Sequence, residues 1–180
     1  MAKKQWALDQ GSGELLLRTG VAGRAAKMGH RLTIAMRRWE ATVGYTGGRP
    51  VALDLTVEAD GLEVLRGEGG VKPISGPEKA IARQNALRSL GADKHPRIEF
   101  HADTITATDD GYEVAGALTI HGVTAPRTLH VDVAQDAAGA HYTCAETVTQ
   151  TDFGIKPFSL MVGSLRVADD VEVTFSATGP

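Results

Sequence analysis

The chain has 180 residues, a formal net charge of -3 and a hydrophobic fraction of 42%. This composition excludes a disordered chain, and the nearly balanced charge gives no general reason to expect a nucleic-acid partner. The length fits one domain, residues 1–180, that is large enough to bury a sizeable core.

The single cysteine and the first residues bear on where the protein works. Cys144 is the only cysteine, so no intrachain disulfide can form, and its alternating surroundings predict a small buried hydrophobe. The chain starts with charged residues, but no apolar segment typical of a secretory signal follows. No stretch approaches the roughly 20 apolar residues that cross a bilayer. We therefore expect a cytoplasmic protein without an integral membrane segment.

Alternation of apolar and polar residues predicts strands near the start of the chain. Residues 14–18 form the first expected strand. Apolar residues then fall on even positions over 30–37 and on odd positions over 39–45. The switch predicts a bulge or bend near Arg37-Arg38, and barrels use such bends to curve their sheets.

The same region is basic. No acid lies between Glu14 and Glu40, and the cations in this stretch are Arg18, Arg24, Lys27, Arg31, Arg37 and Arg38. Two interpretations stay open. The cations form a solvated rim, or they form a cationic mouth that attracts an anionic headgroup.

Further strands surround one helix. Residues 51–58 alternate, and Asp60-Gly61, a strong hairpin signal, is expected to reverse the chain into a strand at 62–66. A helix is predicted over 77–90. Ser75-Gly76-Pro77-Glu78 supplies helix-start chemistry, and Gly91 stands where a helix commonly ends.

The segment Tyr112–Val133 is expected to be an antiparallel hairpin with one apolar face. Its turn is expected at His121–Pro126, because proline cannot donate a hydrogen bond to a neighbouring strand. A strand before it starts near Ile98, and a last strand is expected near 171–177.

Eight to ten strands joined by short turns predict an all-β fold. A sheet of this size usually closes, which also removes its exposed edges. We expect an extended up-and-down antiparallel β-barrel, lipocalin-like and with about eight strands, and one helix inserted near the middle.

No catalytic or metal-binding pattern is found. The six histidines lack ligand spacing, and no phosphate loop, dinucleotide fingerprint or nucleophile elbow is present. The sequence therefore names no catalytic residue, no metal ligand and no cofactor, and an enzyme is not expected. Arg37-Arg38-Trp39 is too short a basic-aromatic patch to predict nucleic-acid binding.

Four motifs in order resemble the YceI family. Residues 116–124, GALTIHGVT, resemble its G-x-L-T-I-x-G-V-T signature. Supporting matches lie at 95–100, 151–155 and 167–173. Residues 69–75 resemble a cytoplasmic branch of the family that lacks the leader peptide.

This resemblance implies a barrel with a long apolar tunnel that binds polyisoprenoid chains or related amphiphiles such as isoprenoid quinones, without catalysis. The chain departs from the family at Arg83-Gln84-Asn85-Ala86-Leu87, which replaces the R-D-x-H-L segment of many members. No headgroup contact is therefore carried over to that segment.

The apolar strand faces are the expected tunnel lining. Aromatic residues, which fill a barrel efficiently, make up only 5% of the chain. Aliphatic side chains leave the axis of a wide barrel open, and Gly116 is expected to widen it further. The expected ligand contacts are Leu32, Ile34, Met36, Leu53, Leu55, Val57, Ile98, Phe100, Val114, Gly116, Leu118, Leu129, Val131, Phe153, Phe158, Val171, Val173 and Phe175.

From the residues alone, a filled core and a cavity are equally acceptable, and the resemblance favours the cavity. We expect a protein that binds, carries or stores an apolar chain or lipid. The alternative is a filled-barrel module in a stress response or an assembly, with partners on its outer surface. The third interpretation is a barrel isomerase with an apolar substrate. A homodimer is left open.

Overall fold

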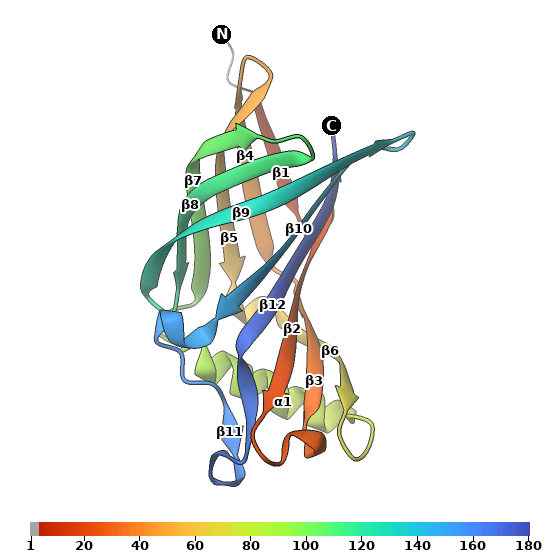
Figure 1. Cartoon of the computed structure of the whole chain (residues 1–180), viewed down its shortest axis with the longest axis vertical. Helices are drawn as coiled ribbons and strands as arrows, with labels where there is room; N and C mark the ends of the chain where they lie inside the picture. Colours follow the sequence, from red (N-terminus) through yellow and green to blue (C-terminus); the bar gives the residue numbers. More distant parts are fainter. Residues whose placement is uncertain (1–3) are drawn as a thin grey trace.

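The computed structural model describes residues 4–180, which form mainly strands, with one α-helix (Figure 1). The helix α1 is Gly76–Ser89, and short 3₁₀ turns are η1 (Ala26–Met28), η2 (Ala59–Gly61), η3 (Gln150–Phe153) and η4 (Met161–Gly163). The strands are β1 (Lys4–Asp9), β2 (Gly13–Ala22), β3 (His30–Met36), β4 (Trp39–Thr46), β5 (Arg49–Glu58), β6 (Leu62–Gly69), β7 (Arg97–Ala107), β8 (Gly111–Ile120), β9 (Val123–Asp136), β10 (Gly139–Thr149), β11 (Ser159–Leu160) and β12 (Leu165–Gly179).

These strands form one curled antiparallel sheet. Their hydrogen-bonded order is β1-β4-β5-β7-β8-β9-β10-β12-β2-β3-β6, with β11 paired to β12. Since β3 leads directly into β4 and β5 into β6, the sheet turns back on itself and forms an elongated barrel (Figure 1). The predicted antiparallel barrel with one inserted helix is confirmed, although the described residues form 12 strands and not about eight.

The higher strand number arises at a sharp corner. The N–H of Arg37 donates to the carbonyl of Gly61 at 2.8 Å, and the N–H of Glu58 donates to that of Arg38 at 2.9 Å. Backbone hydrogen bonding thus continues around the corner, although β3 pairs with β6 on one side of it and β4 pairs with β5 on the other. The bend predicted at Arg37-Arg38 is confirmed, and it separates two strands where a bulge would have interrupted one.

The hairpin predicted at Asp60-Gly61 is wrong. β5 pairs with β4 and β7, and β6 pairs with β3, so the two strands on either side of this dipeptide are not partners. A Cβ atom on Gly61 would lie 2.7 Å from the backbone nitrogen of Arg38. Glycine is needed here because the two halves of the corner touch, and not because a hairpin turns.

The predicted Tyr112–Val133 hairpin is confirmed, but its turn is shorter than expected. Only His121 and Gly122 turn the chain, with φ of 54° and 73°, as in a two-residue hairpin loop. Pro126 lies inside β9, opposite Ala117 of β8. On its other side β9 pairs with β10 only from Val131 onward, so this proline occupies a stretch of strand without a partner there.

Helix α1 begins and ends close to the predicted positions. Ser75 Oγ accepts a hydrogen bond from the N–H of Glu78 at 3.3 Å, and the Glu78 carboxylate accepts one from the N–H of Ser75 at 2.7 Å. This reciprocal pair is a capping box. Gly91, with φ of 60°, follows the C-terminus. The helix lies beside β6 at the lower end of the barrel (Figure 1).

Stability at low pH is expected to depend on this cap. The Ser75 N–H hydrogen bond, with help from Lys72 at 3.1 Å, lowers the pKa of Glu78 from 4.5 to about 2. The cap therefore contributes its full stabilisation above about pH 4.5 and loses it as the pH falls toward 2. We expect Glu78→Gln to lose less stability between about pH 7 and 3 than the wild type, as measured by urea unfolding.

Glu40→Gln is the matched control, because Glu40 is exposed on β4 and forms no ion pair within residues 4–180. It should retain the acid sensitivity of the wild type. Equal acid sensitivity of Glu78→Gln and Glu40→Gln would show that the Glu78 carboxylate does not support the helix.

Candidate ligand-binding cavity

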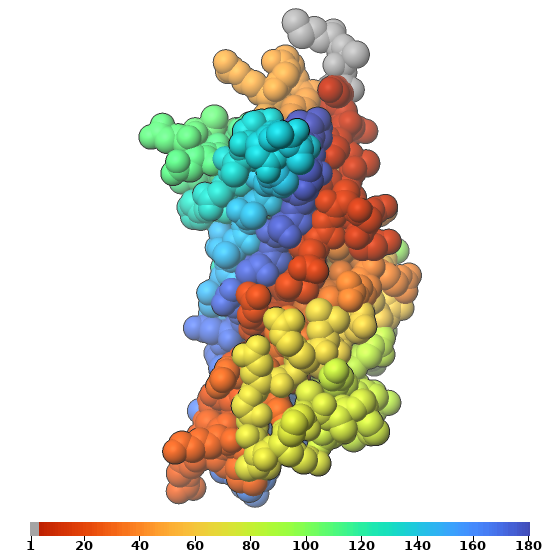
Figure 2. Space-filling model, turned by 90° about the vertical axis from the view of Figure 1, so that its right-hand side faces the viewer, coloured from red at the N-terminus to blue at the C-terminus, as the bar shows by residue number. Residues whose placement is uncertain are grey.

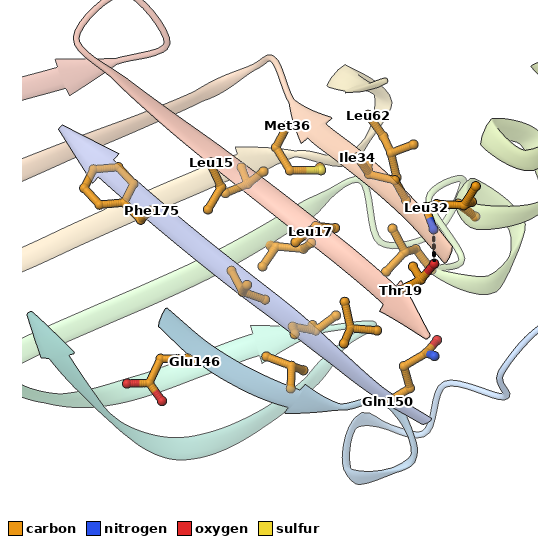
Figure 3. Close-up of a pocket in the computed structure, with 18 of the residues that line it drawn as sticks. Leu15, Leu17, Thr19, Leu32, Ile34, Met36, Leu62, Glu146, Gln150 and Phe175 are labelled. Carbon is orange, nitrogen blue, oxygen red and sulfur yellow. Dashed lines mark hydrogen bonds between the residues drawn. The ribbon is translucent and has the colours of Figure 1, made fainter. Parts of the chain in front are cut away.

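A cavity of about 680 Å³ runs through the interior of the barrel. Trp6, Tyr45 and Pro50 line it at one end, and Met28 and Leu160 line it at the other. Its wall is almost wholly apolar and comes from most of the strands and one face of α1. Figure 3 shows part of this wall, where Leu15 and Leu17 of β2 lie near Met36 of β3.

The apolar strand faces named in the sequence do meet at this cavity. Every expected ligand contact lines it except Gly116 and Phe153. The residues placed in the wall are Leu32, Ile34, Met36, Leu53, Leu55, Val57, Ile98, Phe100, Val114, Leu118, Leu129, Val131, Phe158, Val171, Val173 and Phe175. Alternation identified them because successive side chains of a strand point to opposite faces of the sheet. Their contact with a ligand stays a prediction.

Gly116 does not widen the cavity. A Cβ atom at this position would collide with the carbonyl oxygen of His101 and would lie 2.8 Å from both the Phe100 ring and the Ala102 methyl. The space that the missing side chain leaves is therefore taken by Phe100, which is itself only 3% exposed. The glycine permits close packing of β8 on β7.

Phe153 is buried away from the cavity. It packs in an apolar cluster with Ile120 and Ile155, which do line the cavity. The sequence pattern predicted that it contacts the ligand, but the chain after β10 folds back beside the β8–β9 turn and buries it in this cluster. This long-range contact is invisible to a local sequence pattern.

Aromatic residues gather at one end of the cavity, and none of them is exposed. The rings of Trp6 and Tyr142 lie 5.0 Å apart, and Tyr45 and Tyr112 also line the wall. Burial raises the pKa of the Tyr45 and Tyr142 hydroxyls, so both stay neutral at physiological pH. The Tyr142 hydroxyl donates to the carbonyl of Pro180 at 3.0 Å.

The other end is open. Among the lining residues, the exposed ones are Met28, Val71, Lys72, Ile81, Leu160 and Arg166. All of them belong to η1, the β6–α1 connection, the first turns of α1 and the β11–β12 region, which lie together at the lower end (Figure 1). The mouth of the cavity is therefore at this end.

Helix α1 turns one face toward the cavity. The residues of this segment that line the wall are Glu78, Ile81, Ala82, Asn85, Ala86, Ser89 and Leu90. Their spacing of three and four residues places them along a single helical stripe. The sequence showed the helix but not its role, although this spacing was visible within the predicted segment.

Away from the mouth, where Lys72 and Glu78 pair, one further ion pair interrupts the apolar wall. Arg127 of β9 and Glu146 of β10 approach to 3.7 Å, and both side chains are mostly buried, at 24% and 18% exposed. The Arg127 guanidinium also donates to the carbonyl of Thr147, and Glu146 accepts from the N–H of His130 at 3.0 Å. Backbone pairing of the two strands stops at Val131 and Cys144, so these side chains connect β9 to β10 where the backbones have separated.

Cys144 faces the cavity and is half-buried, where the sequence predicted a buried position. Removal of water from the thiolate, with smaller contributions from Glu146 and Asp132, raises its pKa to about 11.

The described part of the chain was searched for metal-binding groups and for membrane-spanning helices. No group of three or more His, Cys, Asp or Glu residues is placed to hold a metal ion within residues 4–180. Over the same residues, no helix has the length and apolarity to cross a membrane.

Comparison with known proteins gives one family and several similar structures. Residues 19–179 match the family model described as a YceI-like domain. The crystal structure of Burkholderia cenocepacia BcnA has a TM-score of 0.70 at 18% identity, over 96% of this chain and 99% of that one. A Campylobacter jejuni YCEI protein, crystallised with large solvent channels for nanotechnology applications, has a TM-score of 0.56 at 16% identity, over 82% and 84%. No curated protein matches the chain in sequence.

Substitution of Gly116 tests the packing at the β7–β8 pair. We expect Gly116→Ala to lower the free energy of unfolding by about 1–3 kcal/mol, because the added methyl overpacks the site against backbone and the Phe100 ring. Gly76→Ala is the control, since nothing lies within 4 Å of a Cβ atom there. Chemical denaturation should separate the two variants, and equal stability would contradict the observed packing.

Alkylation of Cys144 tests the environment of the cavity wall. The thiolate is the reactive form, so with a pKa of about 11 the rate should rise about tenfold for each pH unit between about 7 and 10. An exposed cysteine would level off above its ordinary pKa of about 8.5. Intact-mass measurement of iodoacetamide labelling distinguishes the two profiles, and a plateau near pH 9 would show an open, solvated thiol.

Proposed function

The chain belongs to the YceI-like domain family, whose hydrophobic barrels bind lipid-like ligands, and we propose that this member holds a polyisoprenoid chain, an isoprenoid quinone or a similar amphiphile in its interior cavity. The observation that carries the proposal is the cavity itself, about 680 Å³ of apolar space inside the barrel. Ligand pockets of known proteins have volumes of this order.

The lining favours an apolar occupant. Aliphatic side chains such as Leu17, Leu55 and Val173 face one another across space that no side chain fills. An apolar ligand restores the dispersion contacts that the lining otherwise lacks. Each buried methylene contributes roughly 0.8 kcal/mol, so a long chain binds without any polar contact.

The shape favours a long occupant over a compact one. β12 alone has 15 residues, which corresponds to about 50 Å of strand at 3.3 Å per residue. The lining extends from the aromatic end to the open mouth, so the cavity follows the long direction of the barrel. An extended prenyl chain fits this form.

The two ends suggest an orientation. The part-buried rings of Trp6 and Tyr142 line the aromatic end, whereas the exposed cations Lys72 and Arg166 line the mouth. We propose that the apolar tail enters first and that the polar headgroup stays at the mouth, where its charge or hydroxyl groups keep contact with water.

Binding without catalysis is part of the proposal. The two charged side chains in the wall away from the mouth, Arg127 and Glu146, are partners of each other and of neighbouring backbone groups. They join β9 to β10 and are engaged with each other in place of a ligand. The filled-barrel alternative has less support, because the interior holds a continuous cavity.

Native mass spectrometry of protein purified from its own host tests the proposal. We expect an additional mass that matches a prenyl lipid, and Leu129→Trp should reduce its occupancy because the indole occupies the cavity. Thr128→Trp is the matched control, since Thr128 is exposed on the outer face of the same strand. Its occupancy should equal that of the wild type.

A ligand-free spectrum, together with no uptake of an added isoprenoid quinone, would contradict the proposal. Equal occupancy in Leu129→Trp and Thr128→Trp would place the bound lipid outside the cavity.

A further inference from the structure

Three segments form the rim of the cavity mouth: residues 23–31, 70–81 and 159–166. Contacts hold them together. The N–H of Ala25 donates to the carbonyl of Ser164 at 2.8 Å, and His30 Nε2 lies 2.7 Å from the carbonyl oxygen of Lys72. In Figure 2 the orange segment around η1 and the yellow segment that leads to α1 lie side by side at the lower end. We call these segments the mouth rim.

The mouth rim exposes most of the large apolar side chains at the surface. Among the described residues, only Val51 and Val123 are large, apolar and exposed elsewhere. The exposed apolar residues of the rim are Met28, Val71, Ile81, Leu160, Met161 and Val162. Val162 is fully exposed, at 107% of its reference area, and Val71 is 78% exposed. An exposed cluster of this kind marks a site of contact with another surface.

The tip of the rim is also strained. Met161 and Val162 have φ of 53° and 55°, a left-handed conformation that is unfavourable for a bulky residue and most unfavourable for a β-branched one. Strained positions of this kind persist where the structure needs them and concentrate at functional sites. Here the strain directs two apolar side chains outward in place of the glycines that such a turn prefers.

The charge of the rim is opposite to that of the whole chain. The protein has a net charge of -3, yet the three rim segments contain a single acid, Glu78. Their cations are Arg24, Lys27, Arg31, Lys72, Lys79 and Arg166. Lys72 pairs with Glu78 at 3.1 Å, and among residues 4–180 no carboxylate lies within 4 Å of the other five.

The rest of the basic stretch behaves differently. Arg18 pairs with Glu172, Arg37 with Glu63 and Arg38 with Asp60, all on the outer surface. The cations between Glu14 and Glu40 are therefore divided between ordinary surface ion pairs and unpaired positions at the rim.

We propose that the mouth rim docks the barrel on a lipid bilayer with anionic headgroups, with Met161, Val162 and Ile81 inserted at the interface. Apolar side chains projecting from a cationic surface are the combination that binds such an interface. Docking places the cavity mouth against the membrane, so an apolar chain passes between bilayer and barrel without crossing water. This role rests on the proposed function, whereas the docking itself does not require a cavity ligand.

Vesicle co-flotation of the full chain tests the docking. We expect binding to vesicles of equal parts phosphatidylglycerol and phosphatidylcholine, weak binding to phosphatidylcholine alone, and loss of binding as salt screens the cations. Val162→Glu should abolish flotation, and Lys27→Glu should weaken it about fivefold or more, the scale of one cation at an anionic surface.

Matched controls lie at the opposite end of the barrel. Val51→Glu changes an exposed valine and Arg49→Glu an exposed cation, both on β5, and both variants should float like the wild type. Val162→Gly should weaken flotation and raise the midpoint of thermal unfolding, because it removes both the apolar tip and the strain. A purely structural tip would not couple these two effects with opposite signs.

Two results would overturn the docking proposal. The first is that the wild type does not float with anionic vesicles, or that Val162→Glu floats with them as well as the wild type does. The other is a stable dimer in light scattering that Val162→Glu dissociates, which would make a second copy of the chain the partner. Fluorescence titration with dansyl-labelled farnesol separates failure of the docking proposal from failure of the proposed function. Val162→Glu should bind this probe in the cavity like the wild type, even though it no longer docks.

Discussion

The structure depends on a mismatch between the width of the barrel and the size of the side chains inside it. Leucine, isoleucine and valine supply most of the inward-facing positions, and they cannot meet across the axis. Larger or aromatic side chains at these positions would fill the interior, and in a narrower barrel the same aliphatic side chains would contact one another across the axis. The remaining cavity is thus a property of the sheet and of residue size together, and it makes an apolar chain the natural occupant.

The barrel tolerates this open interior because much of its core packing lies at the corner. Trp39, Met36 and Leu62 are buried where β3 turns into β4 and β5 turns into β6. The Trp39 ring meets Phe175 of β12 edge-on, with centroids 5.5 Å apart. This corner joins the two halves of the sheet, while the inner faces of the strands above and below it line the cavity.

The two ends of the barrel differ in chemistry. One end is lined by part-buried aromatic rings, and the other is formed by short turns and the first part of α1, with exposed apolar side chains among unpaired cations. Between the two ends, β9 separates from β10, and Arg127 and Glu146 bridge the gap in place of backbone hydrogen bonds. Such asymmetry gives a tunnel one preferred entrance, which is consistent with loading from a surface.

The sequence by itself determined which side chains face inward. The period of two assigned the apolar faces of nearly every strand, and Ser75, Glu78 and Gly91 marked the helix ends, because these are local properties of the backbone. Only the tertiary structure decided what those faces enclose. Gly116 is covered by Phe100, Phe153 packs outside the cavity, and Asp60-Gly61 serves a corner where a hairpin was expected. Each depends on contacts between segments far apart in the chain, as do the Arg127–Glu146 bridge and the mouth rim, because the distance between facing residues is set only when the sheet curls and closes.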